Sequence, residues 1–444
     1  MKILILGSND IAYNLAQELS KIDYAVTVVD NKVDQIKQID RELDVKGIIG
    51  YPTYPSVLDN ADCETTDILI AVLDNDEANM VACQIAHSLF NVPLKIARIK
   101  NHHYLNQGKL YGDEDLPIDV FISPEILLTR QITSLINFPG AEEIRFFGSA
   151  YIVLIRIQAS SPWITQKIKT VENDNECLIT FIQRDGKWLI PDIKFSLKEN
   201  DQVLFASKRG NVSKILASAG IENPEINNIM VGGLGHNGTN LIRNIQSNYN
   251  IKAIEKNSQQ CNRAATEFEN ITVLHGKISD RQLMVDEGVA QSDFFCALTD
   301  DESENILSSL MAKKMGCKKV VTLLTNTIYY ECINELVDYV IISKLALINA
   351  ILTEIYKGES IHEVKSISCG EITLIKMGIT EHFNHLNFPA TAIPYPKNAT
   401  FVGILRDNEF FSDRDTLIKK GDFVLLASTE ISDIPKMDEL FSSF

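Results

Sequence analysis

Two glycine turns, each lying between an apolar run and a helical pattern, are the segments of this sequence best suited to hold an anionic ligand. The more complete turn is Gly233-Leu234-Gly235-His236-Asn237-Gly238. Glycines allow backbone N–H groups to approach a phosphate closely, and the dipole of the following helix attracts negative charge. Glu255 ends the next apolar run, where a carboxylate accepts hydrogen bonds from ribose hydroxyls. The pattern predicts a dinucleotide site in this half of the chain.

The earlier turn, Gly7-Ser8-Asn9-Asp10-Ile11-Ala12, is degenerate. Asn9 tolerates a left-handed backbone better than most residues, and Ala12 still permits close helix packing. Asp10 puts a negative charge where a phosphate would sit, which is unfavourable unless the side chain points away or caps the helix. Asp30 stands at the expected strand end. This half is therefore either a second nucleotide site or a scaffold that has lost its ligand.

Other polar residues fall where strands end, at the edge of the sheet that binds ligands in such folds. Arg98 closes one apolar run and either pairs with a phosphate or forms a surface ion pair, whereas Leu323 takes this place in the later half. Thr53 and Ser279 follow the third runs and are either hydroxyl donors to a ligand or turn residues.

The fourth apolar runs end in two short loops that we expect to line the pockets. Their residues are Leu73 and Asp74 in the first half, and Leu298, Thr299 and Asp300 in the second. The acids that continue these loops lack the glycine and the spacing of a calcium-binding loop. We therefore expect them to cap the following helices, where the dipole stabilises negative charge, in preference to forming a cation site.

The elements that position these residues are repeated along the chain. The landmarks that recur at a spacing of 226 residues are Gly50 and Gly276, Asp67 and Asp293, and Asn79 and Asn305. The predicted fold class is α/β, a tandem duplication of a Rossmann-like parallel-sheet domain, each copy followed by a small α+β domain. The expected domains are residues 1–137, 138–222, 227–350 and 357–444.

The composition excludes several classes of function. A formal net charge of −17 disfavours binding to nucleic acid or to anionic lipid, because both need clustered Lys and Arg. The eight cysteines are spread singly without metal-ligand spacing, so we expect reduced, packed thiols. The most apolar stretch, 339–356, is interrupted by Lys344, Asn349 and Glu354 and is too polar for a membrane span. We expect neither a signal peptide nor direct membrane insertion.

Several segments together resemble the TrkA family, the peripheral nucleotide-binding subunits of the bacterial Trk potassium-uptake system. They are Asp76 to Asn91, Ile122-Ser123-Pro124-Glu125, Val231 to Gly238, and Ala312-Lys313-Lys314-Met315-Gly316. The resemblance implies two RCK (regulator of potassium conductance) modules that bind NAD or NADH and adenine nucleotides such as ATP or ADP. The nucleotide positions it implies are Gly7, Ser8, Asn9, Asp10, Ile11, Asp30, Leu73, Asp74, Arg98, Gly233, Leu234, Gly235, His236, Asn237, Glu255, Leu298 and Thr299.

The same resemblance implies a homodimer or tetramer on the cytoplasmic face of the plasma (inner) membrane, gating a membrane-embedded Trk-type potassium transporter subunit. The main alternative is an NAD(P)-dependent oxidoreductase, which needs a positioned acid or base beside the nicotinamide. The eight histidines are scattered, and His102 and His103 stand in a polar segment where solvation is the simpler expectation. We therefore predict a regulatory protein with no catalytic residues and no metal site.

Overall fold

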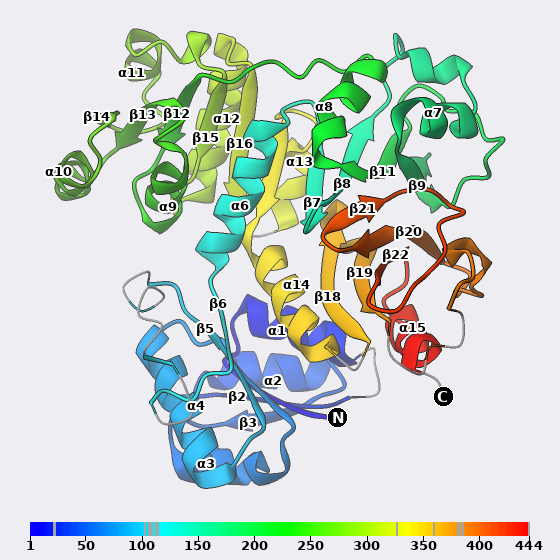
Figure 1. Cartoon of the computed structure of the whole chain (residues 1–444). Coiled ribbons are helices and arrows are strands. Elements are labelled where there is room, and N and C mark those ends of the chain that lie inside the picture. Colours follow the sequence, from blue (N-terminus) through cyan, green and yellow to red (C-terminus); the bar gives the residue numbers. More distant parts are fainter. Residues whose placement is uncertain are drawn as a thin grey trace. The chain divides into compact units, whose positions relative to one another are not determined.

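The computed structural model describes residues 1–20, 24–101, 104, 110–111, 115–325, 327–357, 360–379, 383 and 386–442 (Figure 1). His102 and His103 lie outside these residues. Within the described ranges, no helix combines the length and the apolar character needed to cross a bilayer.

The first large domain is built on a parallel sheet with the strand order β3-β2-β1-β4-β5-β6. Its strands are β1 (Lys2–Leu6), β2 (Ala25–Asp30), β3 (Lys46–Ile49), β4 (Ile68–Ala71), β5 (Leu94–Arg98) and β6 (Val120–Ile122). The helices between them are α1 (Asp10–Ser20), α2 (Val33–Glu42), α3 (Pro55–Asn60) and α4 (Asp76–Phe90). Apart from the exposed Lys2 at the start of β1, the central strands are apolar because helices cover both faces of a doubly wound parallel sheet. Their carboxyl ends form one edge, which is where the predicted site residues lie.

The second large domain repeats this topology with the order β14-β13-β12-β15-β16-β17. Its strands are β12 (Asn228–Gly232), β13 (Asn250–Glu255), β14 (Ile271–His275), β15 (Phe294–Ala297), β16 (Lys319–Leu324) and β17 (Tyr339–Ile342). Its helices are α9 (His236–Ile245), α10 (Ser258–Glu267), α11 (Arg281–Asp286), α12 (Glu302–Met315) and α13 (Tyr330–Ile333). Asp301 caps α12 by accepting from the Glu304 amide, and Gly316 ends it with a φ of +108°.

Each small domain contains an antiparallel sheet, and the two sheets share one topology. The first consists of β7 (Glu143–Phe147), β8 (Ala150–Arg156), β9 (Leu178–Arg184), β10 (Lys187–Leu189) and β11 (Gln202–Lys208), with α7 (Ile168–Asn175) and α8 (Arg209–Ser218). The second consists of β18 (Ile361–Ile367), β19 (Ile372–Gly378), β20 (Ala399–Arg406), β21 (Glu409–Phe411) and β22 (Phe423–Ser428), with α15 (Asp433–Ser442). One apolar cluster joins both sheets and includes Phe181 and Leu374. The predicted fold class, a duplicated α/β domain followed each time by a small α+β domain, is confirmed.

Two helices pack in the half of the protein to which they do not belong by chain order. Helix α6 (Pro124–Asn137) presents Leu128, Ile132, Leu135 and Ile136 to a core shared with Leu241 of α9. Their spacing of four, three and one residues places them on one stripe of the helix. Conversely, residues 343–355 of α14 (Ser343–Tyr356) form one compact unit with residues 1–127. The two halves therefore exchange these helices (Figure 1).

Candidate functional site

The glycine turn of the second half leaves a cradle for an anion. Gly233 has a φ of +96° and donates its N–H to the Ile254 carbonyl at 2.8 Å, which turns the chain sharply after β12. Gly235 precedes α9, and within the part of the chain that the structure describes no side chain caps this helix. A Cβ added at Gly235 would meet nothing within 4 Å, whereas one at Gly238 would lie 1.9 Å from the Gly233 oxygen. The helix thus approaches the turn closely, and the space beside Gly235 at its start is open to a ligand.

Glu255 fixes the other side of this cradle. Its side chain is buried and accepts hydrogen bonds from the Leu234 and Asn257 amides, both at 2.8 Å. The carboxylate therefore joins the glycine turn to the end of β13. Its remaining acceptor capacity suits the ribose hydroxyls of a dinucleotide.

A cavity of about 350 Å³ opens between these elements. Its lining residues are Gly233, Gly235, Ile254, Glu255, Lys256, Asn257, Gln260, Ile278, Thr299, Asp300, Asp301 and Glu304. This volume is in the range of small-molecule sites. Four predicted residues, Gly233, Gly235, Glu255 and Thr299, line the cavity. The other four second-half residues lie close by in the chain but are not among the lining residues: Leu234 and Leu298 are buried, and His236 and Asn237 open α9.

A buried asparagine holds the loop after the fourth strand in each half. In the second half, Asn305 accepts from the Thr299 amide at 3.0 Å and donates to the Thr299 and Leu323 carbonyls at 2.9 and 3.1 Å. In the first half, Asn79 makes the same three contacts with Leu73 and Arg98. The sequence marked both asparagines by their repeat spacing, but spacing alone did not reveal this positioning role.

The turn of the first half differs from that of the second because its own side chains form hydrogen bonds with its backbone amides and with Asp30. Asn9 accepts hydrogen bonds from the Ile11 and Ala12 amides at 3.1 and 3.2 Å, and so caps α1 itself. The backbone of Asn9 does not have a positive φ, so the left-handed conformation that an asparagine tolerates is not used here. Ser8 donates its amide and its hydroxyl to Asp30, at 2.7 and 2.8 Å.

Asp10 does not cap α1 but pairs with Lys344 of α14. The carboxylate is exposed, with 67% of the side chain accessible, whereas Lys344 is largely covered. The charge that looked unfavourable beside a phosphate is thus compensated by a lysine more than 300 residues away in the chain. The side chain of Ile11, the remaining predicted turn residue, is buried in the core.

Basic side chains gather around Asp74 at the same edge. Lys32 Nζ lies 3.5 Å from its carboxylate, and Arg98 Nη1 lies 4.0 Å from it. Burial raises the pKa of Asp74, but the hydrogen bond from Asn9 and the charges of Lys32, Lys100 and Arg98 outweigh it and leave that pKa below its usual value. Arg98 is mostly buried, so it is not the surface arginine of the simpler interpretation.

The acids after the fourth strands act mainly within the protein. Asp301 caps α12 as expected, but the side chain that caps α4 is the amide of Asn75 and not an acid. Asp76 instead accepts from the Lys100 and Asn101 amides at 3.0 and 2.9 Å. Among the described residues, no group of three or more His, Cys, Asp or Glu is arranged to hold a metal ion. Ser279 donates to Glu304 at 3.2 Å, which ties the third-strand loop to α12.

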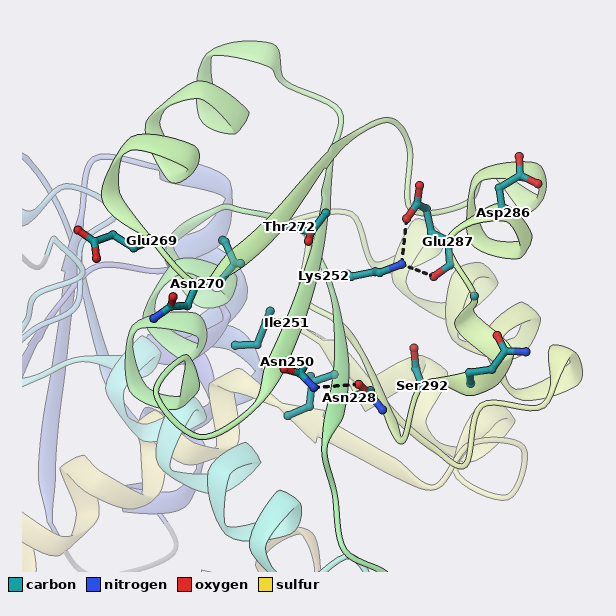
Figure 2. A pocket seen from close by; sticks show the side chains of 14 residues that line it. Asn228, Asn250, Ile251, Lys252, Glu269, Asn270, Thr272, Asp286, Glu287 and Ser292 are labelled. Carbon is teal, nitrogen blue, oxygen red and sulfur yellow. Dashed lines mark hydrogen bonds and ion pairs between the residues drawn. The ribbon is translucent and has the colours of Figure 1, made fainter.

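A second hollow of about 590 Å³ lies at the opposite, amino-terminal end of the second sheet (Figure 2). The Lys252 ammonium points across it to Glu287, donating to its carbonyl at 2.8 Å and to its carboxylate at 3.0 Å. Asn250 donates to Asn228 at 3.3 Å. None of the predicted nucleotide residues lines this hollow, and its lysine is already paired.

Two parallel sheets, each with a glycine turn and an acid at its carboxyl edge, define a tandem dinucleotide-binding fold. The TrkA-N domain model matches residues 3–124 and 229–343, and the TrkA-C domain model matches residues 152–220. The chain is 31% identical over 450 residues to the Trk system potassium uptake protein TrkA of Halomonas elongata, covering 99% of this chain and 98% of that one. The protein of the same name from Vibrio alginolyticus is 29% identical with the same coverage. The chain belongs to the TrkA family.

Solved structures share the fold at low sequence identity. The GsuK RCK domain superposes with a TM-score of 0.60 at 16% identity, covering 100% of this chain and 95% of that one. The GsuK channel bound to NAD gives a TM-score of 0.61 at 16% identity, covering 100% of this chain and 79% of that one. The duplicated RCK-type arrangement expected from the sequence is confirmed.

Proposed function

We propose that this chain is a cytoplasmic regulatory subunit that binds nucleotides and gates a membrane-embedded potassium transporter of the Trk type. The observation that carries the proposal is the uncapped Gly233–Gly238 turn facing a cavity bounded by Glu255, in a chain that aligns over its whole length with Trk potassium uptake proteins. The GsuK channel, which shares the fold, has been solved with NAD bound, and this supports the choice of ligand.

In the second half, the backbone amides after Gly235 would hold the pyrophosphate of NAD or NADH, and Glu255 would accept the ribose hydroxyls. In the first half, Ser8, Asp30, Asp74 and Arg98 would surround ATP, ADP or a second dinucleotide. The nucleotide supplies no bond-breaking step in this role. It acts by stabilising whichever arrangement of a dimer or tetramer binds it more tightly, and the transporter responds to that shift.

The residues that line the cavity beside Glu255 favour a regulatory role over hydride transfer. Its polar side chains are engaged in holding loops, as Glu255 holds the turn and Glu304 accepts from Ser279. An oxidoreductase additionally needs an acid or base placed beside a substrate. Oxidation of NADH with any pool of cellular metabolites would revive the enzyme alternative.

The direct test uses Gly235→Ala in the full chain. An added methyl group meets no protein atom but projects into the cradle, so we expect loss of NAD binding with unchanged folding. Gly210→Ala is the matched control, because its Cβ also meets nothing within 4 Å and the residue lies on α8 of a small domain. Calorimetry with NAD, NADH, ATP and ADP measures binding, and potassium flux through the reconstituted Trk-type transporter measures gating. Wild-type protein that binds none of the four nucleotides would refute the proposal.

A further inference from the structure

The first half gathers cations where the second half offers bare amides. Lys32 and Arg98 pair with Asp74, Lys100 Nζ lies 3.4 Å from the Asp74 carbonyl oxygen, and Lys344 pairs with Asp10. Both carboxylates remain about two-thirds exposed, at 66% and 67%. Four cations therefore surround two solvent-facing carboxylates at one sheet edge, and this excess of positive charge suits a ligand of higher negative charge.

Among these cations, Arg98 gives the strongest indication of an anionic ligand. Its Nε is buried and has no hydrogen-bond partner among the described residues, although a guanidinium carries five donors. Burial also lowers the pKa of its side chain, partly offset by Glu125, Asp74 and Asp76. A buried donor without a partner is costly, and the ion pair of Arg98 with Asp74, at 4.0 Å, compensates this cost only weakly. An anion at this edge would satisfy the arginine.

The cavity beside Glu255 in the second half carries a net negative charge, in contrast to the cation-rich edge of the first half. Among its lining residues Lys256 is the one cation, and it faces the four carboxylates of Glu255, Asp300, Asp301 and Glu304. Leu323 stands where the first half has Arg98, and Asn257 follows Glu255 at the interval at which Lys32 follows Asp30. The second half is suited to a ligand with few charges held by amides, and the first to a ligand with more charges held by side chains.

We propose that Lys344, on the helix supplied by the second half, is a phosphate-binding residue of the first-half site, and that this site takes a polyphosphate nucleotide. On binding, Lys344 exchanges its Asp10 partner for the terminal phosphate, while Arg98 and Lys32 leave Asp74 for the same anion. This inference rests on the proposed nucleotide binding and specifies its ligand class and one further binding residue.

The test compares Lys344→Ala with Asp10→Asn in the full chain, titrated with ATP and with NAD by calorimetry. Both substitutions break the same ion pair, so a purely structural role gives both the same effect. In our proposal the effects on ATP are opposite. Lys344→Ala weakens binding about tenfold because a charged donor to phosphate is lost, and Asp10→Asn strengthens it because a competing carboxylate is removed. Lys37→Ala, an exposed lysine on α2 of the same domain, is the charge-matched control.

A second readout follows α14 itself. We expect ATP to change hydrogen-exchange protection across residues 343–356 in wild-type protein and not in Lys344→Ala. NAD binding to the cavity beside Glu255 should be the same in both proteins. Equal or same-sign effects of the two substitutions on ATP affinity would overturn the inference while leaving nucleotide binding intact. Absence of binding of every nucleotide to wild-type protein would instead refute the proposed function.

Discussion

Because α6 packs in the second half, it predicts which domain a core mutation in this helix will destabilise. Ile132 is completely buried in a cluster with residues of β12 and α9, although it precedes that domain by about a hundred residues. Ile132→Ala removes three carbon atoms from this core, and large-to-small changes at such sites cost about 2–5 kcal/mol. A loss of about 3 kcal/mol raises the population of the locally open state roughly a hundredfold.

Native-state hydrogen exchange measures this effect segment by segment. We expect faster exchange in β12 to β15 and little change in β1 to β4, because the lost contacts belong to the second sheet. Ile126→Ala serves as the control, since this isoleucine lies on the same helix but is 37% exposed. Faster exchange confined to the first sheet would contradict the reasoning, because it would place the inner face of α6 on the domain that precedes it.

Two further predictions concern buried polar groups of the second half. Asn305→Ala leaves the Thr299 and Leu323 carbonyls without their donor, so we expect the unfolding free energy from urea denaturation to fall by about 2–4 kcal/mol. We also expect weaker NAD binding, because Thr299 lines the cavity. An unchanged denaturation midpoint would count against this role of Asn305. Burial raises the pKa of Asp293, but Lys318 and the amides of Asn228 and Asn227 outweigh it and leave that pKa lowered. The stability that Asp293 contributes is therefore present above about pH 4 and lost as the pH falls through its lower folded value, so the difference in unfolding free energy between wild type and Asp293→Asn should shrink on acidification. A difference that grows instead would contradict the assignment.

The sequence predicted the parts of this molecule that depend on local pattern. Each apolar run that ends in a glycine or an acid became a strand ending at the ligand edge, because a buried parallel strand needs continuous apolar residues and the turn after it needs a residue that tolerates positive φ. The repeat spacing located Asn79 and Asn305 before their role was known. The acids at the start of α12 were expected to cap it, and Asp301 does so.

What the sequence did not predict depends on contacts between distant segments. The apolar stripe of α6 fits either sheet, so periodicity cannot say which of the two it covers. The turn around Asp10 was ambiguous for the same reason, because its partner Lys344 lies in the other half of the chain. Asn9 was read for its backbone tolerance, whereas its function in the structure comes from its side-chain oxygen. The cation cluster was found only in part, since Arg98 alone stood in a recognisable position.

The exchanged helices bear on how the chain can be divided. Residues 221–227 form an irregular link between the halves, so a protease cut there would sever the backbone. Each fragment would still carry the helix that completes its neighbour, and separating them would expose two apolar stripes to water. Such interlocked fragments should co-purify.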